Sequence, residues 1–282
     1  MKTPRFIYFG TPAVAQKTLA ALVGAGYTPA LVVTSPDAPK GRGLSLSPCS
    51  TRAWAMEHAL ETFTPEKIDD AAITHICNIG ADFAIVVAYG KILPQALIDV
   101  FPKGILNIHY SLLPKYRGAS PVEAALLHGD TITGVSIQKM VFALDAGDVL
   151  AVRETPIAPE ETARELRPRL ITLGADLLIE TLPSFITGTH TLTPQDETKA
   201  SRCKKIKKED GELSLSGDTR ENWNKYRAYA EWPGTYFFTE RGGKNIRVKI
   251  TTASFKNGSF IIERVIPEGK REMAYVDFMR GV

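Results

Sequence analysis

Residues 104–121 read GILNIHYSLLPKYRGASP, and this stretch predicts a buried strand that ends in a loop. The apolar run at its start follows a Pro-Lys-Gly turn, which is typical of a strand entered from a turn. Side chains two apart on a strand share a face, so Asn107 and His109 should project side by side. Pro114 and Gly118 then interrupt regular structure, as happens where a strand of an α/β fold ends at a functional loop.

The polar pair formed by Asn107 and His109 has two interpretations. Polar side chains at the end of a buried strand are costly unless something uses them. A capped strand end with a hydrogen-bonded histidine accounts for the spacing as well as an active site does. The pair alone therefore leaves both interpretations open.

A third group, Asp145, favours the interpretation of this region as an active site. Residues 134–141 predict a further strand, and residues 143–148 predict the loop that carries Asp145. Asn107, His109 and Asp145 together supply an amide, an imidazole and a carboxylate. Transfer of an acyl group to an amine passes through an oxyanion, and each donor that stabilises it is worth about 2.7–4 kcal/mol.

The carboxylate of Asp145 has a separate expected role. Beside an imidazole it raises the pKa and fixes the orientation of the ring. A loop residue beside a glycine turn, as is usual for the sequence Asp-Ala-Gly, accounts for Asp145 equally well.

Two motifs carry a family resemblance. The pattern Asn-x-His-x-Ser-Leu-Leu-Pro-x-Tyr-Arg-Gly-Ala-x-Pro spans 107–121, and Met-x-x-x-Leu-Asp-x-Gly-Asp spans 140–148. The chain resembles the folate-dependent formyltransferases in both. Further segments match in order and favour the branch of the family that acts on transfer RNA: 9–12, 35–37, 41–43, 88–94, 204–211 and 231–234.

The resemblance implies a site and a donor. Asn107, His109 and Asp145 match the catalytic residues of the family, and the formyl donor is expected to be 10-formyltetrahydrofolate. Neither a metal nor a nicotinamide cofactor is expected. The residues that match the folate-contacting positions are Ser111, Leu112, Leu113 and Pro114, with Val87, Tyr89 and Gly90 around a preceding strand.

The resemblance also implies an acceptor, methionyl-initiator tRNA. The matching basic residues are Lys40 and Arg42 in a glycine-rich loop, and Lys204 and Lys205 near a change in composition. Lysine and arginine bind nucleic acid by neutralising phosphates. An ordinary surface turn explains the first pair as well, and a solvated face explains the second.

Two other functions stay open. The first is formyl transfer to an amino sugar carried by a nucleotide, with the same chemistry and a different acceptor pocket. The second is a module that binds folate or RNA without turnover. The presence of all three groups, Asn107, His109 and Asp145, argues against the second, because binding alone does not need that combination.

The expected fold is α/β, with a doubly wound, mostly parallel, Rossmann-like sheet followed by a shortened OB-like β-barrel. Strands are predicted at 5–9, 30–34 and 83–88, and Pro12 is placed to open a helix that ends at about residues 24–26. A second helix is predicted over 163–186.

The domains are expected to be a catalytic domain at 1–188, a linker at 189–206 and a tRNA-binding domain at 207–282. In the last of these, runs at 235–238 and 246–250 around Gly242-Gly243 predict a hairpin. The resemblance implies that the barrel is shortened, because strands that longer family members carry are missing here.

Composition limits the cellular setting. The 282 residues carry a net charge of +3, which does not identify a nucleic-acid binder. Cys49, Cys77 and Cys203 are odd in number and widely spaced, which is unlike a disulfide framework. The sequence shows no signal-peptide core and no stretch of about 20 apolar residues. These features predict a cytoplasmic protein without a membrane partner, and we expect a monomer.

Overall fold

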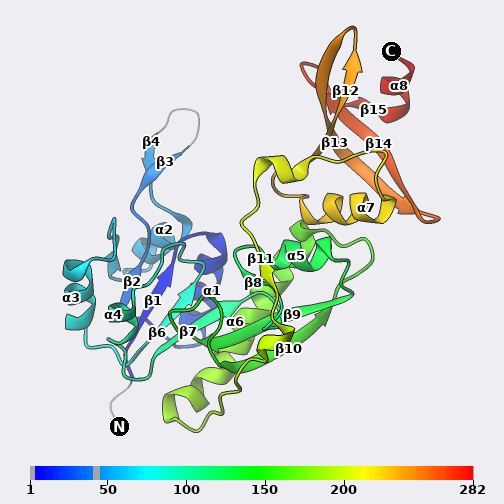
Figure 1. The fold of residues 1–282 in the computed structure, drawn as a ribbon. Coiled ribbons are helices and arrows are strands. Elements are labelled where there is room, and N and C mark those ends of the chain that lie inside the picture. Colours follow the sequence, from blue (N-terminus) through cyan, green and yellow to red (C-terminus); the bar gives the residue numbers. More distant parts are fainter. Residues whose placement is uncertain (1–3, 41–44, 282) are drawn as a thin grey trace. The chain divides into compact units, whose positions relative to one another are not determined.

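The computed structural model describes residues 4–40 and 45–281. The chain forms two compact units, and each is built from several segments (Figure 1). The first comprises Met1–Arg117, Gly134–Glu154 and Pro168–Ser201, and the second comprises Gly118–Thr133, Thr155–Arg167 and Arg202–Val282. The expected domain boundaries at 188 and 206 stay a prediction.

A seven-stranded sheet with the order β10-β9-β7-β6-β1-β2-β5 organises the first unit. The pairs β1–β2, β1–β6, β2–β5 and β6–β7 are parallel, whereas β7–β9 is antiparallel. The doubly wound, mostly parallel sheet is therefore confirmed. The strands are β1 (Phe6–Gly10), β2 (Leu31–Val33), β5 (Thr62–Phe63), β6 (Phe83–Val87), β7 (Ile105–His109), β9 (Ile132–Lys139) and β10 (Val149–Pro156).

Helices cover both faces of this sheet, because its central strands are apolar on both sides. On one face the Tyr8 hydroxyl donates to the Ala15 carbonyl of α1 at 2.6 Å, and Phe83 meets Phe185 of α6 edge to face. The opposite side chains of β1 pack with residues of α3 and α4. The helices are α1 (Ala13–Gly24), α2 (Ser50–Glu57), α3 (Asp70–Asn78), α4 (Gln95–Ile98) and α6 (Ala163–Thr187).

Helix α6 corrects one sequence-based expectation. It is long and apolar enough to cross a membrane by length and composition alone, although the sequence analysis found no such stretch. Its apolar side chains nevertheless lie inside the fold, since Leu170, Leu178 and Leu182 are fully buried and Phe185 is nearly so. Helix α6 is therefore a core helix.

A small antiparallel sheet with the order β12-β13-β14-β15 forms the core of the second unit. Gly242 and Gly243, with φ of 56° and 73°, turn β12 into β13, so the predicted hairpin is confirmed. Helices α5 and α7 pack against each other, and α8 packs on β14. The elements are α5 (Pro121–Leu127), α7 (Thr219–Ala228), β12 (Thr235–Arg241), β13 (Lys244–Lys256), β14 (Ser259–Pro267), β15 (Met273–Ala274) and α8 (Tyr275–Arg280).

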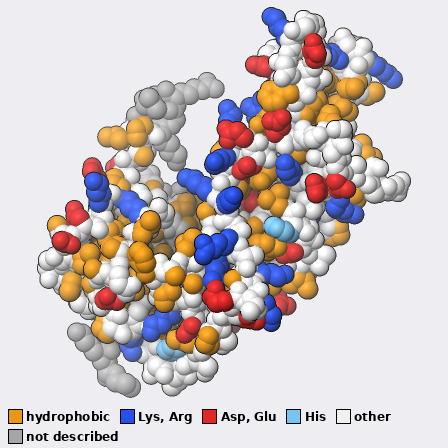
Figure 2. Space-filling view, in the orientation of Figure 1, with side chains coloured by type: hydrophobic (Ala, Val, Ile, Leu, Met, Phe, Trp, Pro, Cys, Tyr) orange, Lys and Arg blue, Asp and Glu red, His pale blue; other side chains and the backbone are white. Residues whose placement is uncertain are grey.

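Short elements complete the chain. They are the ribbon of β3 (Ala38–Lys40) with β4 (Ser45–Ser47), the strands β8 (Arg117–Gly118) and β11 (Arg202–Cys203), and the 3₁₀ turns η1 (Glu197–Lys199) and η2 (Lys208–Gly211). Figure 2 shows basic and acidic side chains interspersed over the face that it draws, in keeping with the small net charge of +3.

Candidate active site

Three of the matching motifs meet at the carboxyl ends of the parallel strands. Thr11 follows β1, and its hydroxyl donates to the Tyr89 carbonyl beyond β6 at 3.0 Å. The same hydroxyl lies 3.1 Å from that of Ser35, which follows β2. In open α/β sheets this edge is where ligands bind.

Strand β7 positions Asn107 and His109 on one face of the sheet. Ile108 between them faces α6, where a Cβ on Gly174 would lie 3.0 Å from its side chain. The two polar side chains therefore point away from α6. His109 is buried, whereas Asn107 is half-buried and its carboxamide has no hydrogen bond to any residue that the structure describes.

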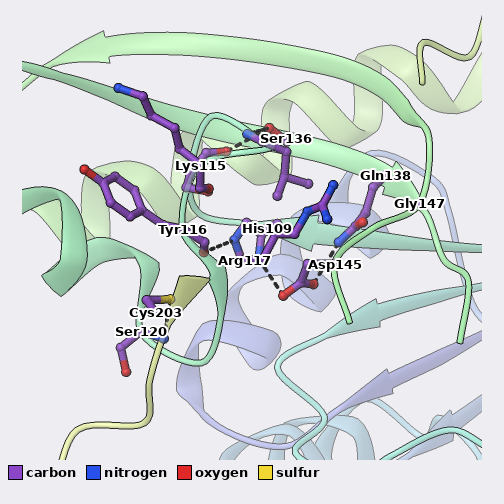
Figure 3. A network of polar contacts seen from close by, with 12 residues as sticks. His109, Lys115, Tyr116, Arg117, Ser120, Ser136, Gln138, Asp145, Gly147 and Cys203 are labelled. Carbon is purple, nitrogen blue, oxygen red and sulfur yellow. Dashed lines mark hydrogen bonds and ion pairs between the residues drawn. The ribbon is translucent and has the colours of Figure 1, made fainter. Parts of the chain in front are cut away.

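Both ring nitrogens of His109 face oxygen atoms (Figure 3). Nε2 lies 2.9 Å from the Tyr116 carbonyl oxygen, and Nδ1 lies 3.6 Å from Oδ2 of Asp145. A carbonyl oxygen only accepts hydrogen bonds, so Nε2 carries a proton. The 3.6 Å separation is too long for a hydrogen bond. In the neutral ring Nδ1 carries the lone pair, so it can take up a second proton.

Burial lowers the pKa of His109 below its ordinary value of 6.5, and this effect is the largest. The Asp145 carboxylate and the Tyr116 carbonyl raise the pKa and offset part of the decrease. The contribution of Asp145 has the sign that was expected from the sequence. Desolvation of the imidazole outweighs that contribution, which the sequence did not predict. His109 is therefore neutral at neutral pH.

The loop that carries Asp145 is tightly constrained. Asp145 has a φ of 50°, in the left-handed region that non-glycine residues seldom adopt. Its Oδ1 accepts a hydrogen bond from Gln138 Nε2 at 2.9 Å, and Gln138 lies across from Asn107 in the β7–β9 register. A Cβ on Gly147 would lie 1.8 Å from the Lys139 carbonyl oxygen, so only glycine fits there.

Ser136 holds the predicted folate-contacting turn. Its hydroxyl donates to the Ser111 carbonyl at 2.8 Å and accepts from the Leu113 amide at 3.0 Å. Ser111 is fully buried, and its own hydroxyl donates to the Lys115 carbonyl. The Ser111 side chain therefore stabilises the turn, while Leu112 and Pro114 stay partly exposed. Folate binding by this stretch stays a prediction.

The second predicted folate-contacting stretch follows β6. Val87 and Tyr89 are buried, and burial raises the pKa of Tyr89 to about 12. Between and after them, Ala88 and Gly90 are exposed with φ of 46° and 84°. What this stretch presents at the surface is therefore main chain in a left-handed conformation, whose polar groups can bond to a ligand.

The predicted tRNA-binding residues are separated along the chain. Lys204 and Lys205 are exposed after β11. Lys40 ends β3, and Arg42 lies outside the described residues. Within 4–40 and 45–281, no group of three or more His, Cys, Asp or Glu side chains could hold a metal ion.

Four residues that support this site were not predicted from the sequence. Ser136 and Gln138 alternate with the apolar Val135 and Ile137 along β9, and this alternation was a usable signal. Arg117 and Gln195 are 78 residues apart in the chain and bond to each other through their side chains. No local pattern connects them.

Two known protein families match most of the chain. The family described as formyl transferase matches residues 4–182, and the family described as formyl transferase, C-terminal domain, matches residues 205–261.

Full-length relatives agree with these matches. A methionyl-tRNA formyltransferase of Solibacter usitatus (strain Ellin6076) is 36% identical over 98% of this chain and 95% of its own length. The protein of the same name from Koribacter versatilis (strain Ellin345) is 37% identical with the same coverage.

Solved structures share the fold at lower identity. The methionyl-tRNA formyltransferase from Clostridium thermocellum has a TM-score of 0.61 and 18% identity, with 94% of this chain and 99% of that chain covered. A sugar N-formyltransferase from Shewanella sp. FDAARGOS_354 has a TM-score of 0.67 and 16% identity, with 90% and 99% covered.

Proposed function

The chain belongs to the formyl transferase family, among the methionyl-tRNA formyltransferases, and we propose that it formylates the α-amine of methionyl-initiator tRNA for translation initiation. The formyl donor is 10-formyltetrahydrofolate, and the setting is the cytoplasm. The observation that carries the proposal is the placement of Asn107 and His109 on one face of β7, with Asp145 beside the imidazole.

The three side chains divide the chemistry between them. Attack of an amine on a formyl carbon creates an oxyanion, and the Asn107 carboxamide, which has no partner among the described residues, can donate to it. Neutral His109 can take up the proton of the attacking amine at Nδ1, and this proton would pass to the donor nitrogen when its bond to the formyl carbon breaks. Asp145, 3.6 Å away, then stabilises the imidazolium that forms.

The residues at the edge of the sheet fit a folate. When bound, 10-formyltetrahydrofolate supplies the formyl group. The exposed main chain of Ala88 and Gly90 and the turn at 111–114 would hold it. Structures with this fold include an N-formyltransferase from Helicobacter canadensis in complex with folinic acid and HypX from Aquifex aeolicus in complex with tetrahydrofolic acid. Their ligands support a folate here.

A basic hollow on the second unit supports an RNA acceptor. It measures about 460 Å³, and Lys208, Arg247, Lys249 and Lys270 line it together with Trp232. None of these four cations forms an ion pair with a described residue. Trp232 is 53% exposed, and the Arg247 guanidinium lies 3.8 Å from the centre of the Tyr236 ring. Unpaired cations attract phosphates, and an exposed aromatic ring can stack on a base.

Formylation of an amino sugar is the second candidate, because proteins with that activity share the fold. At 16–17% identity this likeness concerns the fold alone. The full-length relatives at 35–37% identity favour the tRNA acceptor.

The test is a formyl-transfer assay with 10-formyltetrahydrofolate and three acceptors in parallel: methionyl-initiator tRNA, methionyl-elongator tRNA and an amino-sugar nucleotide. Selective formylation of the initiator is expected. Activity on the sugar nucleotide alone would overturn the acceptor while leaving the chemistry intact. Size-exclusion chromatography of the same preparation tests the proposed monomer, with and without tRNA.

A further inference from the structure

Residues 193–197 lie against the loop that carries Asp145, although the sequence analysis treated them as a linker. Thr193 and Val149 exchange two backbone hydrogen bonds, of 2.8 and 2.9 Å. Two residues later, Gln195 Nε2 donates to the carbonyl oxygens of Asp145 at 2.9 Å and of Gly147 at 2.7 Å. One side-chain amide therefore bonds to the main chain on both sides of Ala146.

The orientation of the Gln195 amide follows from its partners. Its Oε1 accepts from Arg117 Nε at 3.0 Å and from Nη2 at 2.8 Å. A guanidinium only donates and a carbonyl only accepts, so the amide cannot be turned around. Arg117 is 5% exposed, and Glu197 also binds it at 2.7 Å.

Arg117 also lies next to the second partner of His109. It directly follows Tyr116, whose carbonyl accepts from His109 Nε2 at 2.9 Å. On the other side of the imidazole, Asp145 is the residue whose main chain Gln195 binds. Arg117 and Gln195 thus connect the backbone segments that face both ring nitrogens.

The Asp145 loop needs such support because its conformation is unfavourable for the residue. A non-glycine residue at a φ of 50° adopts a sparsely populated conformation, which persists only when the surroundings hold it. A displacement of about 1 Å at a catalytic group can cost about 10²-fold in rate. The hydrogen bond from Gln195 to the Asp145 carbonyl restricts the backbone of Asp145, and the backbone sets the direction of the side chain.

We propose that Gln195 is a positioning residue that holds Asp145 against His109, with Arg117 as its buried anchor. The expected effect on kcat rests on the proposed formyl transfer. The expected effect on the pKa of the His109 imidazole does not depend on it. The segment 193–197 thereby becomes part of the active-site scaffold. Loss of the amide should let the Asp145 carboxylate move away from His109, and the pKa of His109 should then fall.

The test compares Gln195→Leu and the shorter amide in Gln195→Asn with the matched control Thr191→Ala. Thr191 is exposed, lies four residues earlier and makes no hydrogen bond with the described part of the chain. We expect kcat to fall about 10²-fold in both Gln195 variants, with KM for folate and tRNA changed less than twofold. Thr191→Ala should match the unmodified enzyme.

Two further measurements separate positioning from a purely structural role. An NMR titration of the His109 imidazole should give a lower pKa in both Gln195 variants, as it should in Asp145→Asn. Adding Gln195→Leu to Asp145→Asn should lower kcat by less than twofold further, because the two residues act through one interaction.

Two results would overturn the proposal: an unchanged His109 pKa in a folded Gln195→Asn protein, or independent, multiplicative effects in the double variant. The NMR result does not depend on formyl transfer. A shifted pKa in a protein that formylates no acceptor would therefore uphold the positioning role and reject the proposed function.

Discussion

Polar side chains are buried and bonded to partners at the edge of the seven-stranded sheet, whereas the lysines in the basic hollow of the second unit are exposed and form no ion pairs with described residues. Around β7, His109 and Arg117 are buried, and each is held by named partners. Around β13 and β14, Lys249 and Lys270 are exposed and form no ion pair with a described residue. Stabilising a transition state needs donors fixed in advance, whereas attracting a polyanion needs charge density. The two regions therefore suit chemistry and acceptor binding respectively.

The largest effect should follow from removing a donor at β7. Asn107→Ala and His109→Ala should each lower kcat by about 10²–10³-fold, because the first removes the proposed oxyanion donor and the second removes the group proposed to take up the proton. Single-turnover formyl transfer with saturating folate and tRNA measures this loss. Asn78→Ala, on the exposed surface of α3, is the matched control. If either β7 variant keeps full activity, the substituted residue has no catalytic role.

A smaller effect should follow from moving the Asp145 loop without touching its side chains. In Gly147→Ala the new methyl group meets the Lys139 carbonyl, so the loop must shift. We expect kcat to fall about 10²-fold and the free energy of unfolding to fall by about 1–3 kcal/mol.

The control for Gly147→Ala is Gly24→Ala, where nothing lies within 4 Å of the added methyl group. Steady-state kinetics and urea unfolding measure the two effects on the same preparations. A Gly147→Ala enzyme with unchanged kcat would show that the reaction tolerates a displaced Asp145 loop.

A still smaller effect, of a different kind, should follow in the basic hollow. Lys249→Gln should raise KM for the tRNA, leave kcat unchanged and reduce the slope of log affinity against log salt by about 1. Measurements at several salt concentrations test this. Lys256→Gln at the end of the same strand is the control, because Lys256 does not line the hollow. If the slope of log affinity against log salt were equal in both variants, the basic hollow would not bind the tRNA.

The sequence predicted those features whose causes are local. Continuous apolar runs predicted the parallel strands, and Gly242-Gly243 predicted its hairpin. The alternation of Asn107 and His109 placed both on one face. Interactions between distant segments were not predictable in this way: the bond from Gln195 to Asp145 joins residues 50 apart in the chain. The net effect on the His109 pKa also needed the fold, because desolvation depends on everything packed around the ring.

The smallest expected effect concerns the pH dependence of stability, and it tests the burial that distinguishes β7 from the basic hollow. The folded-state pKa of His109 is lowered, chiefly by burial. Below the unfolded pKa of about 6.5, the unfolded chain therefore binds one proton more than the folded chain. Stability that is present above this pH is lost on acidification, by up to about 1.4 kcal/mol per pH unit, until the folded pKa is reached.

Urea unfolding of the unmodified protein and of His109→Gln between pH 7.5 and 5 measures this loss. His109→Gln should lose less stability over that range, because it lacks the buried imidazole. Asp145→Asn should extend the loss to lower pH, because the carboxylate that raises the His109 pKa is gone. Parallel curves for His109→Gln and the unmodified protein would mean that the imidazole takes up its proton as readily in the fold as in water. Burial would then not distinguish His109 from the solvated cations of the basic hollow.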